Sequence, residues 1–427
     1  MPYCFQLKKS ILEGEVRIPA SKSHTIRAVA IASLAEGKSR IHFPLVSEDT
    51  LAAVGSYEKL GAEIEMSSRL WTIQGVGGKV EAPSKVLDVG NSGTTLRIVM
   101  GSSALLFDGE VVLTGDDQIR RRPSGPLVES LNDLGASVSS IVNPGFPPFE
   151  VRGRIRGGTT TIEAKTSQYL TSLLINCPLG DGDSTIFVPL LNEESYVKMT
   201  LEWLGKQGIS FEHKGMNQFL IHGGQRYGSF EENIPADFSS ATFFLGAGAL
   251  PENDVVCLGL NINDSQGDKA VIDYLRQMGA KVEVDDDRIR VRGGGLKGVD
   301  IDLNDTPDAL PMMAVVGCFA RGKTRLLNVP QARIKETDRI KVMYTELKKM
   351  GAKIRELSDG LEIEESKLKS AQVSGHGDHR IVMALAIAGV ATTGETIIDS
   401  AESVAITFPT FYDCLQKIGG NITNINN

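Results

Sequence analysis

One pair of local signatures recurs six times along the chain, and this recurrence constrains the fold more than any other feature. The first signature is an apolar helical run that ends in glycine and continues into a strand, as in Leu60-Gly61-Ala62-Glu63-Ile64. Its glycines lie 68 to 74 residues apart, at Gly61, Gly135, Gly208, Gly279, Gly351 and Gly419. Glycine at this position ends a helix in the left-handed conformation. A period longer than the ~20–50 residues of solenoid repeats indicates a small domain-like unit used six times.

A second signature lies between these copies and agrees with them in phase. It is a small-residue helix followed by a glycine-polar turn and a strand, at Gly37, Gly109, Gly182, Gly322 and Gly394, with Pro251-Glu252-Asn253-Asp254 in the fourth copy. Each unit is therefore predicted to run strand, helix, strand, helix, strand, strand. This alternation favours the α/β class.

The repeats also predict the domain organisation. At 427 residues the chain is too long for one ordinary core, and its length alone suggests about three domains. Six similar units divide more naturally into two domains of three. The repeat phase places the two short crossings near Pro19–Ser21 and Ile234–Asp237. We therefore expect an N-terminal domain of residues 20–236 and a C-terminal domain of residues 1–19 with 237–427.

Composition limits the classes of partner. The net charge of −8 argues against general nucleic-acid binding, which needs a basic surface. The five cysteines are scattered and never at metal-ligand spacing, and His376 and His379 lack a third ligand, so we expect neither disulfides nor a metal site. We expect no signal peptide, because residues 1–9 lack the apolar core of one. The apolar stretches near 309–320 and 381–391 are too short to span a membrane. We expect a cytoplasmic monomer.

Cations gather where they are not expected, at the starts of the small-residue helices. Ser, Thr, Asp and Asn occupy these starts in phase, near Ser23, Thr94, Ser167, Ser239, Asp308 and Asp378, and N-capping alone would explain them. Capping does not explain Lys22, Arg27, Arg97 and Arg380, because the helix dipole disfavours cations there. An anion bound between these cations and the free N–H groups of the helix start would explain their position. Two domains that face each other with these ends would form a cleft for small polyanionic substrates.

Two further segments carry basic residues. Arg120, Arg121 and Arg122 precede Pro123, and an exposed basic loop is the alternative interpretation. Lys335 and Arg339 share one face of a helix start with Glu336 beside them, where a solvated charged face is the alternative. The segment Gly317–Thr324 matches a nucleotide P-loop letter for letter. That motif requires strand, loop, helix, whereas the repeat predicts helix, turn, strand here, so we reject it.

Together these motifs resemble the 5-enolpyruvylshikimate-3-phosphate synthase family of enolpyruvyl transferases, over essentially the whole chain. The resemblance implies a two-domain inside-out α/β barrel with three repeats per domain and an active site in the interdomain cleft. The motifs that carry it are Ser21-Lys22-Ser23 with Arg27, Asn91-Ser92-Gly93-Thr94 with Arg97, Arg122-Pro123, Ser167-Gln168, Pro307-Asp308, Arg333-Ile334-Lys335-Glu336-Thr337-Asp338-Arg339 and Asp378-His379-Arg380.

The resemblance also implies a reaction. It is the transfer of the enolpyruvyl group of phosphoenolpyruvate to the 5-hydroxyl of shikimate 3-phosphate, with release of phosphate, by addition and elimination through a tetrahedral intermediate. Asp308 would act at the hydroxyl and Glu336 at the methylene carbon, with Lys22 close to both. No metal or organic cofactor is implied. Glyphosate would be a competing inhibitor, for which Gly93 leaves room.

The family pattern assigns binding residues to each substrate. Shikimate 3-phosphate would be held by Lys22, Ser23, Arg27, Thr166, Ser167, Gln168, Tyr196, Asp308, Gln331 and Lys335. Phosphoenolpyruvate would be held by Lys22, Asn91, Gly93, Arg122, Gln168, Arg339, His379 and Arg380.

Three positions depart from the family pattern. Ile406 stands where many members carry Lys, Glu193 stands where Ser is common, with Ser195 as the candidate replacement, and Gln331 stands for Asn.

Two other functions are alternatives to this reaction. The UDP-N-acetylglucosamine enolpyruvyl transferases share the barrel but commonly carry a reactive Cys before the Arg-Pro, and residues 108–122 contain none. A catalytically inactive binding scaffold is disfavoured because Lys22, Asp308, Glu336 and Arg380 are all retained.

Overall fold

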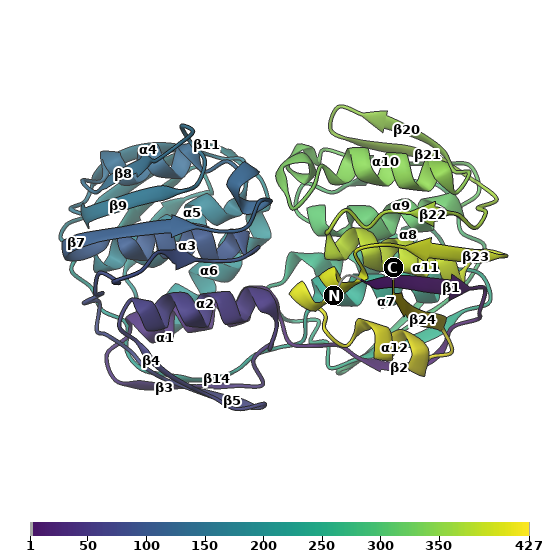
Figure 1. The fold of residues 1–427 in the computed structure, drawn as a ribbon, viewed down its shortest axis with the longest axis horizontal. Coiled ribbons are helices and arrows are strands. Elements are labelled where there is room, and N and C mark those ends of the chain that lie inside the picture. Colours follow the sequence, from purple (N-terminus) through teal and green to yellow (C-terminus); the bar gives the residue numbers. More distant parts are fainter. Residues whose placement is uncertain (1–2, 427) are drawn as a thin grey trace. The chain divides into compact units, whose positions relative to one another are not determined.

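A four-stranded sheet corresponds to each sequence repeat in residues 3–426, which are the residues that the structure, a computed structural model, describes (Figure 1). The chain divides into two units, each described by itself. The N-terminal unit is Ala20–Ile234, and the C-terminal unit is Met1–Pro19 with Pro235–Asn427. Among the described residues no helix is both long and apolar enough to cross a membrane.

The N-terminal unit contains three sheets and the helices that connect their strands. The first sheet has the order β14-β3-β5-β4 and comprises β14 (Glu231–Asn233), β3 (Lys38–His42), β5 (Leu70–Gln74) and β4 (Glu63–Met66), with α1 (Lys22–Leu34) and α2 (Glu48–Lys59). The second comprises β6 (Leu87–Asp88), β7 (Leu105–Thr114), β9 (Phe149–Arg154) and β8 (Ser137–Ser140), with α3 (Gly93–Ser103), η1 (Ile119–Arg121) and α4 (Gly125–Asp133). The third comprises β10 (Gly158–Ala164), β11 (Ser184–Leu191), β13 (Gln218–Ile221) and β12 (Phe211–Lys214), with α5 (Ser167–Asn176), η2 (Cys177–Leu179) and α6 (Glu194–Lys206).

The C-terminal unit repeats this arrangement. Its first sheet comprises β16 (Lys281–Asp285), β17 (Arg288–Arg292), β15 (Asp254–Leu258) and β2 (Glu13–Arg17), with α7 (Phe238–Ala249), η3 (Gly267–Ala270) and α8 (Val271–Gln277). The second comprises β18 (Asp300–Asp302), β19 (Lys323–Leu327), β21 (Gly360–Glu364) and β20 (Lys353–Leu357), with η4 (Pro307–Ala309), α9 (Leu310–Cys318), η5 (Pro330–Ile334) and α10 (Arg339–Lys349). The third comprises β22 (Gln372–Val373), β23 (Glu395–Ile398), β1 (Tyr3–Lys8) and β24 (Asn421–Asn426), with α11 (His379–Val390), η6 (Ala401–Ile406) and α12 (Phe411–Lys417).

All six sheets share one topology. Each sheet has one parallel strand pair at an edge and two antiparallel pairs, as in β10-β11-β13-β12. In four sheets a helix joins the two parallel strands, as α5 joins β10 and β11. In the other two the edge strand comes from a distant segment, β14 beside β3 and β2 beside β15. The predicted order of strand, helix, strand, helix, strand, strand is confirmed. The chain completes two sheets with its first strands: β2 pairs in parallel with β15, and β1 lies between β23 and β24.

The helices, not the sheets, are the most deeply buried elements of each unit. In α3, α7, α9 and α11 every residue is buried, and α1 and α5 are nearly as enclosed. Their small side chains allow these helices to pack against one another, whereas strands such as β10 and β17 alternate between buried and exposed residues. Each sheet thus turns one face to solvent. This is the inside-out arrangement that the family resemblance implied, with a separate core in each unit.

The signature glycines behave as the sequence predicts. All six glycines of the first signature have positive φ, between 67° and 105°. The P-loop-like segment Gly317–Thr324 runs from the end of α9 into β19, so the predicted helix-turn-strand order is confirmed.

Candidate active site

The starts of the buried helices collect the polar side chains of each unit. Five of these six helices have a side-chain cap that accepts from a backbone N–H, at Ser21, Ser92, Thr166, Asp237 and Asp378. The start of α9 differs because the 3₁₀ turn Pro307–Ala309 precedes it. Asp308 lies in that turn, and its carboxylate contacts two arginines. Capping therefore explains five helix starts but not the role of Asp308.

A network of guanidinium and carboxylate groups lies at the helix starts of the C-terminal unit. Arg339 is 1% exposed and binds three carboxylates. Its Nη1 donates to Asp308 Oδ1 at 2.7 Å, its Nη2 to Glu336 Oε2 at 2.5 Å and its Nε to Asp378 Oδ2 at 2.8 Å. Burial alone would lower the pKa of Arg339, but the charges of Asp378, Glu336 and Asp308 outweigh it and raise that pKa. One guanidinium thus orients both predicted catalytic carboxylates.

Arg380 completes this network from the start of α11. Its Nη2 lies 2.9 Å from Asp308 Oδ2, so each oxygen of Asp308 faces a different guanidinium. The hydroxyl of Ser239, from the start of α7, is 3.5 Å from the same oxygen. Side chains from α7, α10 and α11 therefore meet at Asp308 of η4.

The loop before α11 is fixed by a second buried carboxylate, Glu346 of α10. It accepts from His376 Nε2 at 2.9 Å, from the Ser374 backbone N–H at 3.0 Å and from Lys349 Nζ at 2.8 Å. Burial raises the pKa of Glu346, but these donors outweigh burial and leave that pKa below its ordinary value. The loop carries Asp378 and Arg380, so Glu346 supports the network from behind.

In the N-terminal unit, Arg27 of α1 is a buried cation held by neutral acceptors. Its donors reach the Ser23 carbonyl at 2.9 Å, the Tyr196 carbonyl at 3.0 Å and the hydroxyls of Thr200 and Thr171. Within residues 3–426 no carboxylate forms an ion pair with it. Burial lowers the pKa of Arg27 to about 10, so it remains charged at neutral pH. A buried cation without a counter-ion favours the approach of an anion.

Two more arginines converge on Gly93 at the start of α3. A Cβ added at Gly93 would lie 2.5 Å from Arg122 Cζ and 2.5 Å from Arg97 Nη1. The Nη1 of Arg97 donates to the Gly93 carbonyl at 3.1 Å and to Gln168 Oε1 of α5 at 3.2 Å. Only glycine permits both guanidinium groups to approach the backbone this closely. These contacts therefore link the start of α3 to the start of α5 and to Arg122, which follows η1.

Lys22 is paired with an acid that the sequence analysis overlooked. Its Nζ lies 3.0 Å from Asp49 Oδ2, with the two side chains 13% and 4% exposed. Asp49 belongs to the first turn of α2, and the Thr95 hydroxyl of α3 donates to its carbonyl at 3.3 Å. The pair thus joins the starts of α1, α2 and α3.

Known proteins match this chain over nearly its whole length. The family model for EPSP synthase (3-phosphoshikimate 1-carboxyvinyltransferase) matches residues 7–415. The chain belongs to the EPSP synthase family. A relative named 3-phosphoshikimate 1-carboxyvinyltransferase from Acetivibrio thermocellus is 53% identical, covering 98% of this chain and 99% of the relative. One from Methanocaldococcus jannaschii is 42% identical, covering 97% and 98%. A solved structure of EPSP synthase from Acinetobacter baumannii is similar at a TM-score of 0.84 and 28% identity, covering 99% of this chain and 100% of that one.

The remaining residues suggested by the EPSP synthase pattern have varied surroundings. The side-chain amide of Asn91 donates to Asp116 and Gln118, both at 2.7 Å, and so holds the loop before Arg122. Gln331 donates to the Asn304 carbonyl at 2.7 Å. Lys335 is half-buried between η5 and α10, and His379 is buried at the start of α11. Ser23 belongs to α1, and Ser195 and Tyr196 belong to α6.

The side chains that the sequence analysis missed are mostly acids that position the cations. Asp49, Asp378 and Glu346 each bind a cation or the loop that carries one. Asp378 was interpreted only as a helix cap, which it is, but it also holds Arg339. The acidic first turn after Ser47 could have drawn attention to Asp49. No local signal marks the role of Glu346, because the groups that it binds in the loop before α11, His376 and the Ser374 N–H, lie about 30 residues away in sequence.

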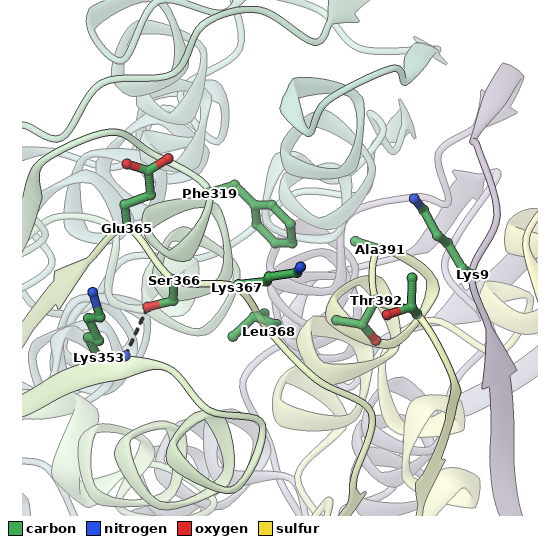
Figure 2. A pocket seen from close by; sticks show the side chains of 10 residues that line it. Lys9, Phe319, Lys353, Glu365, Ser366, Lys367, Leu368, Ala391 and Thr392 are labelled. Atoms are coloured by element: carbon green, nitrogen blue, oxygen red, sulfur yellow. Dashed lines mark hydrogen bonds between the residues drawn. The ribbon is translucent and has the colours of Figure 1, made fainter.

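A cavity of about 520 Å³ in the C-terminal unit lies at the other end of the buried helices. Figure 2 shows Phe319, Lys9, Lys367 and Thr392 among the side chains that line it. Phe319 and Ala391 cap the C-terminal ends of α9 and α11, whereas Asp308 and Arg380 lie at the N-terminal ends. None of the predicted site residues lines this cavity. It is separate from the candidate active site.

Proposed function

We infer that this chain transfers the enolpyruvyl group of phosphoenolpyruvate to the 5-hydroxyl of shikimate 3-phosphate and releases phosphate. Membership of the EPSP synthase family supports this reaction. The observation that carries the assignment of catalytic residues is the sharing of Arg339 by Asp308 and Glu336, at 2.7 and 2.5 Å. The reaction needs two carboxyl groups that exchange protons with different substrate atoms, and one guanidinium fixes both.

Shikimate 3-phosphate is assigned to polar side chains of each unit. In the N-terminal unit these are Lys22, Ser23, Arg27, Thr166, Ser167, Gln168 and Tyr196, and in the C-terminal unit Asp308, Gln331 and Lys335. The buried charge of Arg27 and the hydroxyls at the start of α5 support binding of a phosphate there.

Phosphoenolpyruvate is assigned to the guanidinium groups. Arg122 and Gly93 lie together in the N-terminal unit, and Arg339 and Arg380 lie together in the C-terminal unit. Lys22, Asn91, Gln168 and His379 complete this set. Arginine suits it because its planar fork matches the oxygens of carboxylate and phosphate groups.

The chemistry proceeds by addition and then elimination. In the addition, the substrate hydroxyl forms a C–O bond to C2 of phosphoenolpyruvate as its proton passes to Asp308, and Glu336 protonates the methylene carbon. In the elimination, Glu336 removes a proton from the new methyl group as the bond to phosphate breaks, and the proton on Asp308 returns to the departing phosphate. Fixed cations stabilise the charge of the tetrahedral intermediate between these steps.

We also propose that the enzyme acts as a cytoplasmic monomer. Its five cysteines are free, and four of them are buried, which suits a reducing compartment. Sedimentation of the purified protein tests the oligomeric state, and a mass of 46.0 kDa is expected.

The decisive experiment is phosphate release by the purified protein with both substrates, and with each omitted in turn. Release that requires both substrates is expected. As matched variants, Asp308→Ala should lose this release, whereas Asp300→Ala, an exposed residue of β18 paired with Arg325, should keep it. Binding of both substrates without any phosphate release would indicate an inactive scaffold instead.

A further inference from the structure

Glu193 places a buried carboxylate where the sequence comparison expected a serine. The residue lies between β11 and α6 and is 1% exposed. Its φ of 62° is a backbone conformation that residues other than glycine rarely adopt. It occupies the N-cap position of α6, yet its side chain makes no capping hydrogen bond there. The side chain serves the start of α5 instead.

One oxygen of this carboxylate collects three donors. Glu193 Oε2 accepts from the Thr166 hydroxyl at 3.1 Å, the Ser167 backbone N–H at 3.0 Å and the Ser167 hydroxyl at 2.7 Å. Thr166 and Ser167 are 6% and 2% exposed, so few water molecules can share these donors. Hydroxyls and a free N–H at a helix start are the groups that bind a phosphate oxygen. An anion that belongs to the protein already occupies them.

We propose that Glu193 competes with the phosphate group of shikimate 3-phosphate and thereby limits the affinity of this enzyme for that substrate. The proposal rests on the proposed function, which assigns Thr166 and Ser167 to that phosphate. A phosphate group carries about −1.5 to −2 charges at pH 7 and is repelled by a neighbouring carboxylate. The carboxylate must therefore leave its three donors before the phosphate can accept from them.

The competition is specific to one substrate group. Shikimate lacks the phosphate group that would accept from these donors. Glu193 should therefore leave the affinity of the enzyme for shikimate unchanged. Phosphoenolpyruvate is assigned to other residues, and its affinity should also be independent of Glu193. The side chain thus lowers the preference of the enzyme for the phosphorylated over the unphosphorylated substrate.

A purely structural role makes the opposite prediction. If Glu193 only ties the start of α5 to the start of α6, its removal loosens the donors and weakens binding of shikimate 3-phosphate. A lower melting temperature alone does not separate the two roles. The sign of the change in affinity does.

The test measures the Kd of shikimate 3-phosphate and of shikimate by calorimetry for the wild type, Glu193→Ser and Glu193→Gln. We expect shikimate 3-phosphate to bind about tenfold more tightly to Glu193→Ser, with a smaller gain for Glu193→Gln, which removes the charge but keeps an acceptor. Binding of shikimate should change by less than about twofold. The control is Glu194→Gln, the next residue along the chain, which pairs with Lys198 on the surface of α6 and should change neither Kd.

Unchanged or weaker binding of shikimate 3-phosphate in both variants overturns the proposal, and so does equal tightening of shikimate. If Glu193→Ser does not fold, the near-isosteric Glu193→Gln decides alone. Phosphate release by the wild type separates the two levels of inference. Its absence refutes the proposed function together with this proposal, whereas release with unaltered affinities in the variants refutes only the role of Glu193.

Discussion

Arg339 binds Asp308 through a 2.7 Å hydrogen bond from Nη1 to Oδ1, while the other oxygen of Asp308 faces Arg380 at 2.9 Å. These contacts leave the Asp308 carboxylate little freedom to rotate. They also stabilise its charged form, which is the form that can accept a proton. Arg339 therefore helps to hold the proposed base in place, in addition to its proposed contact with phosphoenolpyruvate.

We predict that Asp308→Ala lowers kcat by about 10²–10⁴-fold, the usual contribution of a positioned acid or base. Binding of shikimate 3-phosphate should remain measurable, because Arg27 and the hydroxyls of α5 supply other contacts. Steady-state phosphate release and calorimetric binding check both parts. Normal turnover of the variant would exclude Asp308 as the base.

A second prediction concerns Gly93. In Gly93→Ala the added Cβ must displace the guanidinium groups of Arg122 and Arg97, which it would meet at 2.5 Å. Since Arg122 is assigned to phosphoenolpyruvate, we expect the KM for that substrate to rise about tenfold or more, which is about 1.4 kcal/mol. The KM for shikimate 3-phosphate should change less.

The matched control is Gly55→Ala in α2, where an added Cβ meets nothing within 4 Å. This variant should keep both KM values and gain up to about 1 kcal/mol of stability, because alanine is the better helix former. Equal increases of both KM values in Gly93→Ala would contradict the assignment of Arg122.

A third prediction concerns the pair of Lys22 and Asp49. Asp49→Asn removes the counter-ion of a mostly buried ammonium group, which then reorients toward solvent or another acceptor. We expect kcat/KM to fall about tenfold, or about 1.4 kcal/mol of transition-state stabilisation. Kinetics of both substrates should show a loss in kcat, because Lys22 lies close to the reacting atoms in the proposed mechanism.

The adjacent Glu48→Gln serves as the control, since Glu48 is exposed in the same helical turn. A loss of stability in Asp49→Asn without a loss of kcat would assign the pair a structural role only.

The sequence predicted the repeat and its order of elements because each glycine signal is local. Gly61 and its five equivalents end helices wherever they occur, whatever the rest of the chain does. The candidate cations could also be predicted, because basic residues at helix starts contradict the dipole rule. Their acidic partners could not be predicted from the sequence. Asp49 and Glu346 act across 27 to 30 residues of sequence, a pairing that depends on helix packing and carries no local pattern.

The last prediction concerns the pH dependence of stability through Glu346. Its folded-state pKa lies below the ordinary value of 4.5, because hydrogen bonds from Lys349, His376 and the Ser374 N–H outweigh burial. A carboxylate with a lowered pKa stabilises the fold fully above pH 4.5 and loses that contribution as the pH falls through the folded-state value. Glu346→Gln should therefore lower the free energy of unfolding by about 1–3 kcal/mol at pH 7, and by less below pH 4.5.

Chemical denaturation at several pH values measures this difference. The exposed Glu365→Gln is a control that is expected to change stability by less than about 0.5 kcal/mol. A cost for Glu346→Gln that stays constant down to pH 4 would contradict a role of its charge in holding the loop of Asp378 and Arg380.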